Sequence, residues 1–138
     1  MVVRVALDSN VYSLLFRGHP LVAEIVRRSE EVVLSAVVIG ELLYGYRYGS
    51  RMARNLRELD DFLAGPRVTL VTVGRTTADR YSRIATALRA KGRPIPTNDI
   101  WIAAHAMETG TELLSSDGHF KHVDGLAWVH VPVGSSRH

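Results

Sequence analysis

Short apolar runs rich in β-branched residues alternate along the chain with longer segments in which apolar residues recur every three or four positions. The short runs are typical of strands buried on both faces of a parallel sheet, and the longer segments are typical of amphipathic helices. We expect strands over residues 2–7, 32–34, 68–73, 112–114 and 127–131, and helices over 9–16, 21–28, 36–45, 50–63, 76–90 and 98–110. This alternation predicts an α/β fold, with a mostly parallel central sheet between two layers of helices. At 138 residues we expect a single domain over 1–138, with a loose tail at 132–138.

Residues at the element ends predict how several helices begin. Ser9 and Ser35 follow strands, and a serine oxygen there can accept a hydrogen bond from a free N–H of the first helical turn. The segment Thr76 to Asp79 resembles a capping box. Prolines at 94 and 96 favour extended backbone just before the helix that begins near residue 98. Glycines at 45 and 49 predict a loose segment between two helices.

Four acidic residues stand out because of where these elements place them. Asp8 and Asp117 follow the first and fourth strands, Glu41 interrupts an otherwise apolar helix face, and Asp99 lies in the first turn of a helix. Ligand crevices of open α/β sheets lie beyond the carboxyl ends of the strands, so the four carboxylates are expected to converge there. Carboxylates without partners raise one another's pKa, so such a site shares protons or binds a hard divalent cation such as Mg²⁺ or Mn²⁺.

Each acid taken singly also has an ordinary structural explanation, as a turn residue, a residue at the edge of the core or a partner of a helix dipole. Four acids that gather at one edge of a sheet for unrelated structural reasons are much rarer than a single acid placed there for such a reason. The joint pattern therefore favours a metal site.

Composition narrows the chemistry further. The chain has no cysteine, which excludes disulfides, thiolate nucleophiles and cysteine-bound zinc and is compatible with a reducing cytoplasm. No apolar run approaches the roughly 20 residues of a membrane span, so we expect a cytoplasmic protein. When the four acids of the expected site are set aside, the chain has 17 basic and 10 acidic residues. A basic exterior around an acidic site suggests a polyanionic substrate with a cation between it and the protein.

Four short motifs carry a resemblance that covers essentially the whole chain. They are LDSN at 7–10, VIGEL at 38–42, NDIWIAA at 98–104 and LSSDGHF at 114–120. In order and spacing these motifs resemble the PIN domain, and more narrowly the VapC-type toxins of bacterial toxin–antitoxin pairs. The resemblance implies a PIN-like three-layer sandwich and a magnesium-dependent ribonuclease, which a cognate antitoxin holds inactive. It also implies homodimerisation.

The same resemblance implies roles for individual residues. Asp8 and Asp99 are the firmest metal ligands, Asp117 is a third, and Glu41 completes the acidic pocket. Ser115 hydrogen-bonds near the pocket, and Asn10 of the first motif supports it. The chain departs from some members of the family two positions after the aspartate of the fourth motif, where it has a histidine in place of a further acid. A second tightly held metal is therefore not expected.

A carboxylate-held Mg²⁺ would lower the pKa of a bound water and orient it for in-line attack on phosphorus. Such hydrolysis needs no pair of acid and base histidines. His105 lies six positions after Asp99, about 240 degrees round an ideal helix, so it should point away from the site and be packed or solvated. His119 is near enough to Asp117 in sequence to touch a substrate, or it is a surface turn residue.

The arginines are the candidates for substrate binding. Two groups recur on helix faces, and the members that we expect to contact RNA phosphates are Arg47, Arg51, Arg80, Arg83 and Arg93. An arginine-rich helix face is also often simply solvated. The aromatic residues of the 45–49 segment suit stacking on unpaired bases, an antitoxin interface or a dimer interface, whereas Trp101 and Trp128 are expected in the core or an interface.

Two alternatives remain open at this stage. A PIN-like scaffold could grip RNA or a partner without cutting it, although such a scaffold has no need to keep four acids. A phosphoacceptor receiver domain also has an acidic pocket on a parallel sheet. It would need a lysine at a strand end near that pocket, whereas the two lysines here are Lys91 at a helix end and Lys121 beyond the fourth motif.

Overall fold

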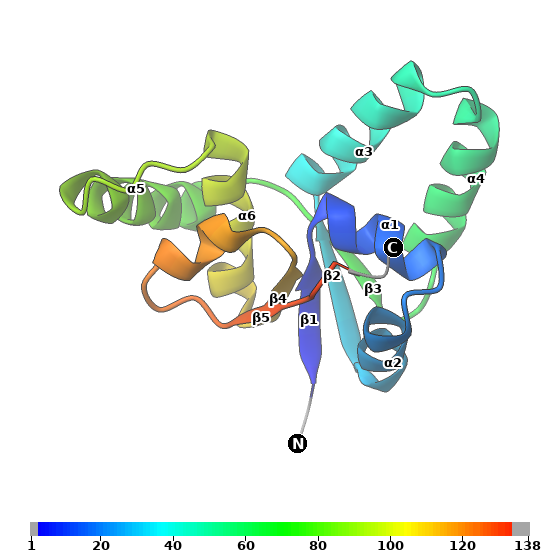
Figure 1. Cartoon of the computed structure of the whole chain (residues 1–138), viewed down its shortest axis with the longest axis horizontal. Helices are drawn as coiled ribbons and strands as arrows, with labels where there is room; N and C mark the ends of the chain where they lie inside the picture. The colour runs from blue at the N-terminus through cyan, green and yellow to red at the C-terminus, as the bar shows by residue number, and fades with distance from the viewer. Residues whose placement is uncertain (1–2, 134–138) are drawn as a thin grey trace.

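Five strands, six α-helices and one 3-10 helix make up residues 3–133, which are the residues that the computed structural model describes (Figure 1). The strands are β1 (Arg4–Leu7), β2 (Glu31–Ser35), β3 (Val68–Val71), β4 (Glu112–Ser115) and β5 (Trp128–His130). The helices are α1 (Ser9–Phe16), α2 (Pro20–Arg28), α3 (Ala36–Tyr48), α4 (Met52–Leu63), α5 (Arg75–Ala90) and α6 (Thr97–Thr109), with the 3-10 helix η1 at Gly118–His122. The expected tail lies mostly outside the described residues.

The strands form one sheet in the order β3-β2-β1-β4-β5, and every neighbouring pair is parallel. The prediction of a mostly parallel sheet is therefore confirmed, with no antiparallel strand among the described residues. The chain builds outward from β1 to β3, and then returns to the other side of β1 to add β4 and β5. The order thus reverses between β1 and β4, which is the position where open α/β sheets form their ligand crevice.

Helices cover both faces of this sheet, as the three-layer prediction required. Helices α5 and α6 lie on one side, and α1, α2 and α4 lie on the other (Figure 1). The central strands β1, β2 and β4 are almost fully buried, because each contributes apolar side chains to both layers. Among residues 3–133, no helix has the length and apolar character needed to cross a membrane.

Three local predictions were wrong. Helix α1 is capped by Asp8 instead of Ser9, because the Asp8 carboxylate reaches the backbone N–H of Val11. Helix α5 begins one residue before Thr76, and its cap is a contact in which the N–H of Gly74 donates to Thr77. The 45–49 segment is not loose, since α3 continues through it to Tyr48.

The predicted cap at Ser35 is confirmed, because the Val38 N–H donates a 3.1 Å hydrogen bond to the Ser35 hydroxyl.

The central strands should dominate the stability of the fold. Leu114 of β4 is fully buried, whereas Leu70 on the edge strand β3 is 47% exposed. Leu114→Ala should therefore lower the free energy of unfolding by about 2–5 kcal/mol, because it leaves a cavity between two packed layers. Leu70→Ala should change it by only about 0.5 kcal/mol. Urea unfolding of both variants checks this, and equal losses would contradict the described layering.

Candidate active site

A cavity of about 410 Å³ opens at the carboxyl edge of the sheet, beside the switch point between β1 and β4. Its lining residues are Asp8, Ser9, Asn10, Glu41, Pro96, Thr97, Asn98, Asp99, Ile102 and Asp117. All four acids singled out in the sequence are among them, and they come from four different parts of the chain. Parallel strands that end at one edge, and helices that start there, bring these acids together.

Asp8 is the most deeply buried of the four acids. It is 5% exposed, and both of its carboxylate oxygens are held: one accepts from the Val11 N–H at 2.8 Å, and the other accepts from the Ser115 hydroxyl. Burial raises the pKa of Asp8 from 3.8 to about 6, although these two hydrogen bonds oppose the shift. Glu41 and Asp99 raise it further through their negative charges. The ionised form of Asp8 is therefore destabilised by its surroundings, and a bound cation would stabilise it.

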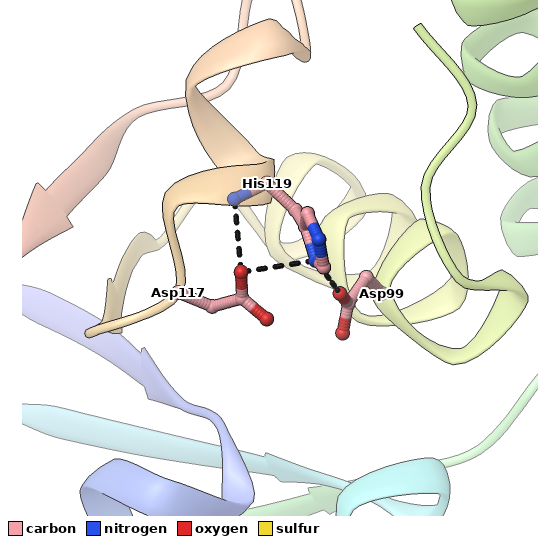
Figure 2. Close-up of side chains that lie close together, drawn as sticks. All are labelled: Asp99, Asp117 and His119. Atoms are coloured by element: carbon pink, nitrogen blue, oxygen red, sulfur yellow. Dashed lines mark hydrogen bonds and ion pairs between the residues drawn. The ribbon is translucent and has the colours of Figure 1, made fainter.

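Asp99 and Asp117 face each other across the cavity, with His119 between them (Figure 2). Nδ1 of His119 lies 3.1 Å from Oδ2 of Asp99 and 3.0 Å from Oδ1 of Asp117. The Asp117 carboxylate also accepts from the His119 N–H at 2.9 Å, which fixes the start of η1. Burial raises the pKa of Asp99, and the hydrogen bond to Asp99 raises the pKa of His119. The pair of carboxylates thus attracts positive charge.

Glu41 reaches the cavity from α3 and is fixed by two hydrogen bonds. The Ser9 hydroxyl donates to one carboxylate oxygen at 3.0 Å, and the Asn98 amide donates to the other at 3.2 Å. These contacts join α3 to the first turns of α1 and α6. Asn10 also lines the cavity, from the first turn of α1. The polar residues around the acids therefore hold the acid side chains in place.

The donor set fits a hard divalent cation. One ligand atom each from Asp99, Asp117 and His119 lies within 4.8 Å of the others. Ligands on opposite sides of a Mg²⁺ ion are separated by about 4 Å, so only a small contraction is needed. Asp8 retains acceptor capacity for a cation, because each carboxylate oxygen has two lone pairs. Oxygen-rich sites of this kind suit Mg²⁺ or Mn²⁺.

His119 is the residue whose place in the site the sequence did not reveal. It was considered as a substrate contact or a surface turn residue, and the structure places it against two of the acids. The available signal was its position two residues after Asp117, where some PIN domains have an acid. His105, by contrast, is packed as expected, since it is 1% exposed in the interior.

The arginines proposed as substrate contacts do not enter the cavity. Within residues 3–133 its lining includes none of Arg47, Arg51, Arg80, Arg83 and Arg93, and all five are exposed. They lie on α3, just before α4, on α5 and in the turn before α6. Arg80 and Arg83 line a different cavity together with Met107, near the C-terminal end of α6 and away from Asp99 in its first turn. Arg83 is also paired with Asp79 at 2.9 Å.

The fold and the acidic cavity together define a class of protein. The family model of the PIN domain matches residues 5–126, and the chain belongs to the PIN-domain family. The resemblance to VapC-type toxins is also confirmed. The chain is 28% identical over 127 residues to Ribonuclease VapC1 of Haemophilus influenzae strain R2866, across 88% of this chain and 93% of that protein.

A second relative and a solved structure agree with this assignment. Ribonuclease VapC2 of H. influenzae strain Rd is 31% identical over 115 residues, across 80% of this chain and 84% of that protein. The structure of VapBC-1 from nontypeable H. influenzae superimposes with a TM-score of 0.81 at 26% identity, and the match covers 92% of this chain and 97% of that one. The predicted PIN-like fold is therefore confirmed.

The buried charge of Asp8 should cost stability. Its pKa is higher in the folded chain than the ordinary value of 3.8, so the ionised carboxylate destabilises the fold above about pH 6, and the effect fades as the pH falls toward 3.8. Asp8→Asn keeps an oxygen for the Val11 cap and removes the charge. It should raise the free energy of unfolding at pH 8 by up to about 3 kcal/mol, in EDTA.

Urea unfolding at pH 8 and pH 4.5 measures this effect, and the gain should shrink at the lower pH. Asp61→Asn is the matched control, because Asp61 is an exposed acid on α4. It should change stability little at either pH. A loss of stability in Asp8→Asn at pH 8 would contradict the assigned environment.

Proposed function

We propose that this chain is a metal-dependent endoribonuclease and the toxin of a toxin–antitoxin pair. The observation that carries the proposal is the convergence of Asp8, Glu41, Asp99 and Asp117 on one cavity at the switch point of the sheet. Membership of the PIN-domain family and similarity to proteins named as VapC ribonucleases support the same activity. The cofactor that we propose is Mg²⁺, with Mn²⁺ as a substitute.

The residues divide the work at this site. Asp8, Asp99 and Asp117 would hold the cation, which would supply an activated water and offset charge on the phosphoryl oxygens. Ser115 orients Asp8 through its hydroxyl, and Glu41 accepts protons or orients water at the α3 side of the cavity. This arrangement needs no attack by the 2′-hydroxyl of the RNA.

His119 has a further role in this proposal. Its hydrogen bond to Asp99 raises the pKa of His119 and so favours the protonated ring, which in that form limits the repulsion between the Asp99 and Asp117 carboxylates. The ring nitrogen that contacts both acids is also a possible metal ligand once it loses its proton. Among the exposed arginines, Arg47 of α3 and Arg93 in the turn before α6 are the proposed contacts for RNA phosphates outside the acidic cavity.

The partner that we propose is a small antitoxin encoded beside this chain. The solved structure that resembles this chain is named VapBC-1, and the match covers 97% of the matched chain. We also propose a homodimer and a cytoplasmic location, where the RNA substrate is found. The scaffold alternative stays less favoured, because Asp8 carries a buried charge that a protein without a cation would have no use for.

Purified protein should cleave RNA only with a divalent cation. We expect cleavage in Mg²⁺, loss of cleavage in EDTA, and a rate for Asp99→Asn that is lower by about a hundredfold or more, because one of the three carboxylates proposed to hold the cation is removed. Gel electrophoresis of a total RNA pool measures the products, and mapping of their ends should find 5′-phosphates.

Asp61→Asn again serves as the control, since this exposed acid lies outside the cavity, and it should cleave like the wild type. Circular dichroism should confirm that each variant is folded. Cleavage by folded Asp99→Asn at the wild-type rate would refute the assigned site. A wild type that binds RNA and cuts none would favour the scaffold.

A further inference from the structure

A second cavity opens between α3 and α6, next to the acidic one. It measures about 440 Å³ and is lined by Val37, Gly40, Glu41, Tyr44, Asn98 and Trp101. Glu41 and Asn98 line both cavities, and their side chains are hydrogen-bonded to each other at 3.2 Å. The two cavities are therefore neighbours that share one pair of side chains.

Two aromatic side chains line this second cavity. Trp101 of α6 is partly buried, and its indole stacks on Tyr81 of α5 with the ring centroids 4.1 Å apart and an interplanar angle of 26°. Tyr44 of α3 is 65% exposed and contacts Tyr48 one turn later, edge to face. The stack with Tyr81 fixes the plane of the indole, and Tyr44 adds an exposed ring on the opposite helix.

We infer that this cavity binds one unpaired base of the RNA that is cut in the acidic cavity. The inference rests on the proposed ribonuclease function. Aromatic side chains that stack on splayed-out bases are the usual means of binding single-stranded RNA, and stacking tolerates any base because each has a flat π-face. Trp101 and Tyr44 provide such surfaces at a concave place, which suits a single base.

Charge and position favour a base over a phosphate in this cavity. The Glu41 carboxylate repels a phosphate and does not repel an uncharged base, whereas the Asn98 amide has both donor and acceptor groups for a base edge. Because Glu41 and Asn98 also line the acidic cavity, the bound base belongs to a nucleotide beside the cleaved bond. The cavity thus contributes to the choice of cleavage site.

Cleavage kinetics give the first test. Tyr44→Ala should raise the KM for a single-stranded RNA about tenfold with little change in kcat, because one stacking surface is lost and the acids are untouched. Trp101→Ala should do the same, and Trp101→Phe should recover most of the effect. Leu70→Ala is the control, since Leu70 is 47% exposed on β3 and does not line the cavity. Equal KM values for Tyr44→Ala and Leu70→Ala would overturn the inference.

Tryptophan fluorescence gives a test that does not depend on cleavage. In a Trp128→Phe, Asp99→Asn protein, Trp101 is the one remaining tryptophan. A random-sequence RNA octamer should quench its emission, and an abasic ribose-phosphate octamer should not. Failure of the proposed ribonuclease activity would appear only in the cleavage assay. An RNA octamer that leaves the emission unchanged would overturn the base site itself.

The competing occupant is a second copy of this chain, because exposed tyrosines also suit a protein interface. Sedimentation of Tyr44→Ala and Trp101→Phe decides between the two. We expect both variants to keep the oligomeric state of the wild type. Dissociation of either variant into smaller species would assign this face to self-association and overturn the inference.

Discussion

The parallel pairing of β1 with β4 is the constraint on which the rest of the structure depends. These strands are neighbours in the sheet, although Asp8 and Ser115 at their ends lie 107 positions apart in the chain. Their register pairs Leu7 with Leu114 in the core, and one residue later it places Asp8 against Ser115. A shift by one residue would exchange the side chains that β1 offers to the two helix layers and would move Asp8 away from Ser115. The register that packs the core therefore also builds the site.

The site concentrates negative charge in a partly buried cavity. Burial raises the pKa of Asp8 and Asp99, and the polar neighbours Ser115 and His119 only partly offset this. Such an arrangement lowers the stability of the free protein and is useful if a cation is to be bound. The acidic cavity and the second cavity, lined by Tyr44 and Trp101, share Glu41 and Asn98, so the proposed cation site and the proposed base site are adjacent.

The sequence predicted the position of a site residue where that position follows from the residue's own strand or helix. Strand ends predicted the places of Asp8 and Asp117, because parallel strands deliver their carboxyl ends to one edge. The sequence did not predict positions that depend on packing between segments far apart in the chain. His119 lies in a polar turn without periodicity, and its contact with Asp99 exists only because η1 folds back onto α6. The sequence predicts Trp101 in the core or an interface. Its place in the second cavity could not be predicted, because that cavity forms only where α3 lies beside α6.

The central claim is that the converging acids bind a divalent cation, and anomalous diffraction from crystals grown with Mn²⁺ tests it most directly. The account predicts an anomalous peak in the acidic cavity, within about 2.0–2.3 Å of carboxylate oxygens of Asp8, Asp99 or Asp117. The peak should disappear in Asp99→Asn crystals. A cavity without a peak at saturating Mn²⁺, or a peak bound by residues elsewhere, would contradict the account.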